Sequence, residues 1–165
     1  MELLVLSKIA RELSHEFKER KKTLGLVESC TGGAISAALV QIPGASDFLL
    51  GSLVVYSNDW KKTFLKVSTL EKFGAVSRET VIEMASHLLE QGKADFVAAI
   101  SGIAGPQGGT PEKPIGTVWI AVAERGKIET AKMVAHGNRQ AIIEAAAIAT
   151  LSALLKRVRG ESAFS

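Results

Sequence analysis

The spacing of apolar residues predicts a long amphipathic helix at each end of the chain. Apolar side chains recur every three or four positions near the start, which predicts a helix over residues 3–21. A second periodic segment opens at Gly137 and Asn138 and continues to about Val158. Both helices carry an apolar stripe that the rest of the fold has to cover.

Between these helices, short apolar runs bounded by turn residues predict five strands. The runs lie at 24–28, 51–56, 96–101, 117–123 and 130–134. The second run is apolar enough that we expect a strand buried on both faces. Helical segments alternate with the first three strands, and the last two form a hairpin. The pattern predicts one α/β domain over residues 1–165, with three layers (α/β/α) and a mixed, mostly parallel sheet of about five strands.

Polar residues mark the helix starts in the middle of the chain. Ser68 and Glu71 match a capping box, in which each side chain bonds to the other residue's amide. Gly74 is expected to end that short helix, and Ser77 to cap a longer one.

Composition narrows the class of protein. Of the 165 residues, 47% are hydrophobic and 22% charged, which is ordinary for a globular protein able to bury a core. The densest basic run, residues 18–22, lies at a predicted helix end without interleaved aromatics, which favours a solvated helix end over a nucleic-acid surface. One cysteine excludes an internal disulfide, and the longest nearly apolar stretch is too short to span a bilayer. We expect a cytoplasmic protein with no nucleic-acid or membrane partner.

The segment from Glu28 to Gly33 is the strongest candidate for chemistry, because it joins the first strand to a helix. Ser29 lies in this turn, and Gly32 and Gly33 lie where the helix begins. Unpaired amides at such a junction suit an anion or a developing oxyanion, and a serine beside them suits acyl transfer. A serine before a helix is also an ordinary N-cap, and the hexapeptide alone favours the cap.

Two further segments follow strand ends, where ligands of open α/β sheets bind. Residues 102–109 contain four glycines, which let the backbone approach a ligand but match neither a dinucleotide nor an ATP fingerprint. Tyr56 and Lys61 flank a predicted strand-to-helix turn. A partly buried lysine can act as a base near neutral pH, and a tyrosine could relay the proton from a serine. A strand-end tyrosine and a surface lysine is the alternative interpretation.

Other candidates for chemistry are weaker. Cys30 is the competing nucleophile, although a lone small thiol usually serves packing. His15, His87 and His136 are scattered without the spacing of metal ligands, so no metal site is predicted. A serine–histidine–aspartate triad stays open on sequence alone.

Several segments occur together in an order that is shared by a known family. They are Glu-Ser-Cys-Thr-Gly-Gly at 28–33, Val-Val-Tyr-Ser-Asn at 54–58 with Lys61, Gly-Ala-Val-Ser at 74–77, Ser-Gly-Ile-Ala-Gly-Pro-Gln-Gly-Gly at 101–109 and Lys-Pro-Ile-Gly-Thr-Val-Trp at 113–119. Together they resemble the CinA C-terminal domain family, whose characterised members are nicotinamide-mononucleotide deamidases. The resemblance covers about residues 3–158 and suggests the stand-alone form of the domain.

The resemblance implies a bacterial amidohydrolase that converts nicotinamide mononucleotide to nicotinic acid mononucleotide and ammonia, in pyridine-nucleotide salvage and without a cofactor or metal. It implies that Ser29 is the nucleophile and that Tyr56 and Lys61 activate it. The residues expected around the nucleotide substrate are Glu28, Thr31, Gly32, Gly33, Gly102, Ala104, Gly105 and Arg139.

The family often has Gly-Asp-Arg before the last helix, followed by further arginines. Here the motif is Gly137-Asn138-Arg139 without that cluster, which leaves Arg139 as the candidate ligand for the 5′-phosphate. Family members without deamidase activity keep a second function open, a non-catalytic nucleotide-binding or competence-related interaction protein on the same fold. An amidase or esterase for another small substrate is a third. The resemblance and the apolar faces of the first and last helices predict a homo-oligomer, most simply a two-fold dimer.

Overall fold

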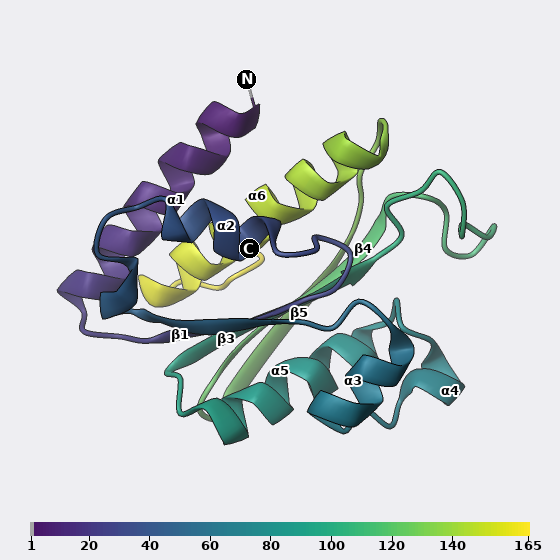
Figure 1. Cartoon of the computed structure of the whole chain (residues 1–165), viewed down its shortest axis with the longest axis horizontal. Helices are drawn as coiled ribbons and strands as arrows, with labels where there is room; N and C mark the ends of the chain where they lie inside the picture. Colours follow the sequence, from purple (N-terminus) through teal and green to yellow (C-terminus); the bar gives the residue numbers. More distant parts are fainter. Residues whose placement is uncertain (1) are drawn as a thin grey trace.

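The computed structural model describes residues 2–165 and contains a five-stranded sheet with helices on both faces (Figure 1). The elements are α1 (Glu2–Glu19), β1 (Leu24–Glu28), α2 (Ala34–Val40), the 3₁₀ turn η1 (Ala45–Asp47), β2 (Leu49–Val54), α3 (Asn58–Leu65), α4 (Leu70–Phe73), α5 (Arg78–Gly92), β3 (Phe96–Gly102), β4 (Thr117–Glu124), β5 (Lys127–Val134) and α6 (Arg139–Val158). The strand order is β2-β1-β3-β4-β5. β1 is parallel to β2 and β3, while β4 is antiparallel to both of its neighbours. The predicted mixed, mostly parallel α/β sheet is confirmed.

Each face of the sheet is covered by its own set of helices. α1, α2 and α6 lie on one face, and α3, α4 and α5 lie on the other (Figure 1). Alternate residues of β1 point into two hydrophobic cores, one on each face of the sheet. Leu24 and Leu26 belong to the core beneath α1 and α6, and Val27 belongs to the core beneath α5. The carboxyl ends of the parallel strands β2, β1 and β3 therefore meet at one edge, with a helical layer above and below it.

The terminal helices largely follow the prediction. α1 ends at Glu19, slightly before the predicted limit, and Lys21 has left-handed backbone geometry with φ 52°. Asn138 caps α6 by accepting a hydrogen bond from the amide of Ala141, and Gly160 follows its end with φ 90°. Capping and turn residues were therefore sufficient to predict the ends of α1 and α6 to within about two residues.

The prediction that the second strand is buried on both faces is wrong. β2 is the edge strand of the sheet, and the side chain of Leu50 is 53% exposed. The connection from β1 to β2 runs over one face through α2, whereas the connection from β2 to β3 runs over the other through α5, so β1 lies between β2 and β3. Apolar content alone cannot distinguish a central strand from an edge strand, because burial depends on which neighbours the crossovers supply.

The predicted capping box at Ser68 and Glu71 is also wrong. The amides of Ser68 and Thr69 donate instead to the carboxylate of Glu83 on α5, at 2.9 and 3.0 Å. Glu71 pairs with Lys62. A carboxylate from a different helix has replaced the local one, which no local sequence pattern specifies. The other predicted features of this region, Gly74 at the end of α4 and Ser77 as the cap of α5, are confirmed.

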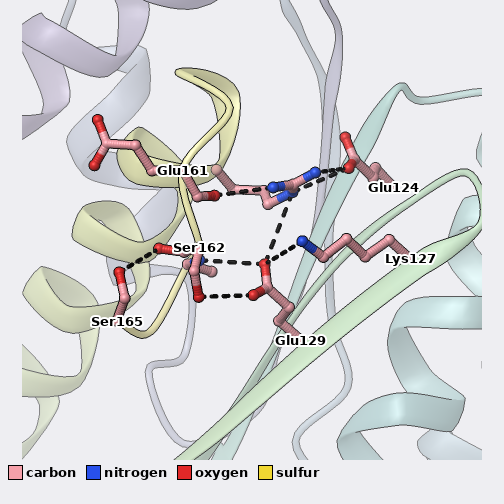
Figure 2. A network of polar contacts seen from close by, with 8 residues as sticks. Glu124, Lys127, Glu129, Glu161, Ser162 and Ser165 are labelled. Atoms are coloured by element: carbon pink, nitrogen blue, oxygen red, sulfur yellow. Dashed lines mark hydrogen bonds and ion pairs between the residues drawn. The ribbon is translucent and has the colours of Figure 1, made fainter.

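A polar network ties the end of the chain to the β4–β5 hairpin (Figure 2). The guanidinium of Arg157 donates to Glu124 at 3.0 Å through Nε, and the carboxylate of Glu129 accepts from the hydroxyl of Ser162 at 2.8 Å. Arg157 forms ion pairs with both Glu124 and Glu129. The side chains of Arg157 and Glu129 are largely shielded from water, so solvent and salt screen these two ion pairs less than they screen surface pairs. Because Glu124 pairs with the first residue of β3, this network lies at the opposite end of the sheet from the carboxyl edge.

The loop between β3 and β4 extends from the carboxyl edge of the sheet (Figure 1). Its base is closed by hydrogen bonds from the amide of Ile103 to the carbonyl of Thr117 at 2.9 Å, and from the amide of Gly116 to the carbonyl of Ile103 at 2.7 Å. Gly116 has φ 89°, and a Cβ added there would lie 1.9 Å from the carbonyl oxygen of Ala135. Only glycine fits this position.

We expect Gly116→Ala to destabilise the protein more than Gly126→Ala does. Both glycines have positive φ, which costs an alanine roughly 1–2 kcal/mol. A Cβ at Gly126 meets nothing within 4 Å, whereas at Gly116 it collides with backbone. Urea unfolding of the two variants measures the difference. Equal losses would show that the contact of Gly116 with Ala135 does not constrain the loop base.

Candidate active site

The turn after β1 is organised by the buried carboxylate of Glu28. Its two oxygens accept five hydrogen bonds of 2.8 to 3.1 Å, from the hydroxyls of Thr31 and Ser52 and from the amides of Gly33, Ile35 and Ser36. A charge that is fully buried requires this many donors to offset the loss of water. The carboxylate also lies at the start of α2, where negative charge is favourable.

Glu28, rather than Ser29, satisfies the start of α2. The N-cap residue is Gly33, which offers no side-chain cap, so the interpretation of Ser29 as a helix cap is wrong. Every amide from Gly32 to Ser36 already has an acceptor inside the chain. An oxyanion or phosphate can therefore receive main-chain hydrogen bonds from this turn only from residues that precede Gly32.

Lys61 is a buried cation at the carboxyl end of β2. It lies on the inner face of α3, is 1% exposed, and donates from Nζ to the carbonyls of Val55 and Tyr56 at 2.9 and 3.1 Å. Burial lowers the pKa of Lys61 from 10.5, and interaction with nearby Cys30 opposes this shift. A lowered pKa makes the neutral amine, the form that acts as a base, easier to reach.

The register of the strands brings Ser29 close to this lysine. The amide of Val55 donates to the carbonyl of Glu28 at 2.9 Å, so Val55 lies beside Ser29 where the two strands end. Val27 faces the core beneath α5, and the alternation of a strand gives Ser29 the same face, which α3 also covers. Ser29 is 6% exposed. The candidate nucleophile and the candidate base thus share one face of one sheet edge.

Tyr56 is joined to Arg139 rather than to the lysine amine. Arg139 is the first residue of α6 and donates to the Tyr56 hydroxyl at 2.6 Å and to the carbonyl of Gly105 at 2.7 Å. Tyr56 is 57% exposed, and its hydrogen bond with Lys61 is made through the main-chain carbonyl. The expected relay from Ser29 through Tyr56 to Lys61 is not formed in this structure. Instead, Tyr56 links the end of β2 to the glycine loop and α6.

The glycine loop lies against the turn through Gly102. A Cβ at this position would lie 2.7 Å from the side chain of Val118 and 3.1 Å from the sulfur of Cys30, so the missing side chain allows the close approach. Ala104 is buried, and Gly105 reaches Arg139 through its carbonyl. Of the residues expected around a substrate, the structure therefore brings Gly105 and Arg139 into direct contact and gives Gly102 a packing role.

Burial makes Cys30 a poor competitor for the nucleophile's role. It raises the pKa of the Cys30 thiol to about 12, and the positive charges of Lys61 and Arg139 oppose this only in part. The thiol is therefore protonated at neutral pH, and it is the thiolate that reacts.

A cavity of about 510 Å³ lies between α1, α2 and α6. Its lining is largely apolar, with Ala34 and Ala37 from α2 and Ile143 from α6, and Arg139 belongs to it as well. The volume is that of a small-molecule site. Arg139 thus lines this cavity and also donates a hydrogen bond to the hydroxyl of Tyr56.

Two further findings apply to the described range, residues 2–165. No cluster of three or more histidine, cysteine, aspartate or glutamate side chains is arranged so that it could bind a metal ion. No helix in the same range combines the length and apolar character that crossing a membrane requires.

The fold and the turn belong to a defined class of α/β domain. The sequence profile of the CinA C-terminal domain matches residues 6–158, so the chain belongs to the CinA C-terminal domain family. A CinA-superfamily protein from Klebsiella pneumoniae superposes with a TM-score of 0.90 at 34% identity, over 94% of this chain and 98% of that one. A competence/damage-inducible protein from Agrobacterium tumefaciens gives a TM-score of 0.90 at 37% identity, over 94% and 96% of the two chains.

The curated relatives are longer proteins. A CinA-like protein of Thermotoga maritima is 49% identical over 145 residues, which are 87% of this chain and 35% of that protein. A CinA-like protein of Cytophaga hutchinsonii is 42% identical over 144 residues, which are 86% of this chain and 34% of that protein. The chain spans about a third of the length of these curated relatives.

The lowered pKa of Lys61 predicts how stability depends on pH. Between its folded pKa and the value of an unfolded lysine, the unfolded chain binds more protons, so the free energy of unfolding contributed by Lys61 rises with pH. We expect Lys61→Met to lose this rise, measured by urea unfolding between about pH 7 and pH 10. Lys62→Met, at an exposed neighbour, is expected to keep it. Identical pH profiles for wild type and Lys61→Met would contradict the shift.

Proposed function

We propose that this chain is a serine amidohydrolase that converts nicotinamide mononucleotide to nicotinic acid mononucleotide and ammonia. The observation that carries the proposal is the buried amine of Lys61, with its lowered pKa, on the same sheet edge and face as Ser29. A serine hydroxyl is a weak nucleophile at neutral pH and needs such a base. Membership of the CinA C-terminal domain family supports the proposal, because the resemblance implies this reaction.

In the first step the Ser29 oxygen attacks the carboxamide carbon. Its proton passes to the neutral amine of Lys61, and the carbonyl electron pair moves to the oxygen. Main-chain amides that precede Gly32 are the donors that this turn can offer to the oxyanion, because those from Gly32 onward are occupied. The substrate's pyridinium ring already withdraws electrons from the carboxamide, so no metal is required.

In the second step the tetrahedral intermediate collapses. Lys61 returns the proton to the amide nitrogen, the carbon–nitrogen bond breaks, and ammonia leaves an ester on Ser29. Lys61 then takes a proton from water, whose oxygen attacks the ester, and finally gives the proton back to the Ser29 oxygen. We assign Glu28 the task of supporting the turn, and Tyr56 the task of holding Arg139.

We assign the 5′-phosphate to Arg139. A guanidinium has five N–H donors, and the contacts with Gly105 and Tyr56 use only some of them. The remainder can bind a phosphate, and the start of α6 adds a favourable dipole. Arg139 would then sit between the phosphate and the tyrosine that follows β2.

Loss of either reacting group should lower turnover steeply. We expect Ser29→Ala and Lys61→Ala each to lower kcat by roughly two to four orders of magnitude, and the double variant to be no worse than either single one, because the residues act as a unit. Cys30→Ala should retain most activity because its thiol is protonated. Ammonia release from nicotinamide mononucleotide measures all four. An inactive Cys30→Ala beside an active Ser29→Ala would transfer the nucleophile's role to the thiol.

Arg139→Ala should mainly raise KM, because the phosphate is remote from the bond that breaks. The comparison to make is between the mononucleotide and its phosphate-free riboside. Wild type should prefer the mononucleotide and the variant should lose that preference, whereas Arg125→Ala, an exposed arginine in the β4–β5 turn, should keep it. If Arg139→Ala discriminates between the two as well as wild type does, the phosphate binds elsewhere.

A further inference from the structure

Ser101 is a buried residue of β3 that stands next to Ser29 across the sheet. β1 and β3 pair in parallel with Glu28 opposite Ile100, so the next residues along, Ser29 and Ser101, are neighbours. Adjacent strands lie about 4.8 Å apart, a spacing at which two serine hydroxyls on the same face can form a hydrogen bond of about 2.8 Å. Ser101 is 1% exposed.

The two serines lie on the same face of the sheet. Ile100 belongs to the core beneath α1 and α6, so Ser101 faces the opposite core, the one that α3 and α5 cover. Trp119, the residue paired with Ser101 on β4, packs against that same core. The row across the end of the sheet therefore reads Val55, Ser29, Ser101, Trp119, and Ser29 is the member of this row whose side chain can accept a hydrogen bond from the Ser101 hydroxyl.

The two serines stand side by side in a part of the site that water reaches poorly. Ser29 is 6% exposed and Ser101 is 1% exposed, so a hydrogen bond between their hydroxyls would be shielded from solvent. The hydroxyl of Tyr56 is bound to Arg139. Catalytic hydrogen bonds often tighten only when substrate is present, and a serine hydroxyl can move among three staggered χ1 positions.

We propose that Ser101 is a positioning residue that acts through Ser29. Its hydroxyl donates to the Ser29 oxygen, which leaves the Ser29 proton to point toward Lys61 on the opposite side. During attack the Ser29 proton moves to Lys61, the new bond forms at the carbonyl carbon, and Ser101 keeps its own proton throughout. Its donated hydrogen bond strengthens as charge develops on the Ser29 oxygen. The inference rests on the proposed serine chemistry, but not on the identity of the substrate.

A fluorophosphonate probe tests this with the full chain, because it reports the reactivity of Ser29 without any nucleotide. We expect Ser101→Ala to lower the rate of Ser29 labelling, and kcat for the mononucleotide, by about ten-fold, the loss of one hydrogen bond to a developing charge. KM and the pH at which labelling is half-maximal should be unchanged, because Lys61 sets that pH. Ser101→Thr keeps the hydroxyl and should restore labelling.

Ser14→Ala is the matched control, since Ser14 is a buried serine like Ser101 but lies on α1, where its hydroxyl has no partner among residues 2–165. It should label like wild type, and thermal unfolding of each variant checks that the fold persists. Labelling of Ser29 that depends on Ser101, without ammonia release, would support this inference while rejecting the proposed substrate. Wild-type labelling in Ser101→Ala, an equal loss in Ser14→Ala, or no labelling of wild-type Ser29 would overturn it.

Discussion

The arrangement of this sheet edge depends on one buried carboxylate. Glu28 accepts five hydrogen bonds from the turn, from the start of α2 and from Ser52 on β2. Breaking one partner of such a network leaves buried polar groups unpaired, which costs far more than the network adds to stability. The turn that carries Ser29 is therefore held in one shape by the strand before it, the helix after it and the strand beside it.

Several elements contribute to the site around that turn, and each adds one group with a distinct environment. α3 supplies Lys61, which is buried away from water, so its pKa is lowered and its proton is lost more easily. α6 supplies Arg139, which keeps free donors while it bonds to Tyr56 and to the glycine loop. The same burial that lowers the pKa of Lys61 raises that of Cys30, because desolvation disfavours the charged form of each. Burial at this site thus favours the neutral, basic form of Lys61 and keeps the neighbouring Cys30 thiol protonated and unreactive.

Several sequence interpretations failed for a common reason. Ser29 was expected to cap α2, but the carboxylate one residue earlier does so instead. The capping box at Ser68 was expected to close with Glu71, but a carboxylate of α5 takes its place. The hydroxyl of Tyr56 binds an arginine 83 positions further along the chain, a contact that no local pattern indicates. At both helix starts the expected residue type was suited to its local role, but a carboxylate outside the expected pair accepts the amide hydrogen bonds instead.

The sequence by itself determined the helices and strands and which side chains were candidates for catalysis. Apolar periodicity, the hairpin and the start of α6 at Asn138 depend on neighbours a few residues apart. So does the placement of Ser29 directly after β1 and of Lys61 in the helix that follows β2. Only the tertiary structure decided that β2 lies at the edge, that Lys61 loses its water, and that Ser101 stands beside Ser29. These features depend on strand order and register, which are set by contacts between segments tens of residues apart, and no local pattern encodes which of those segments meet.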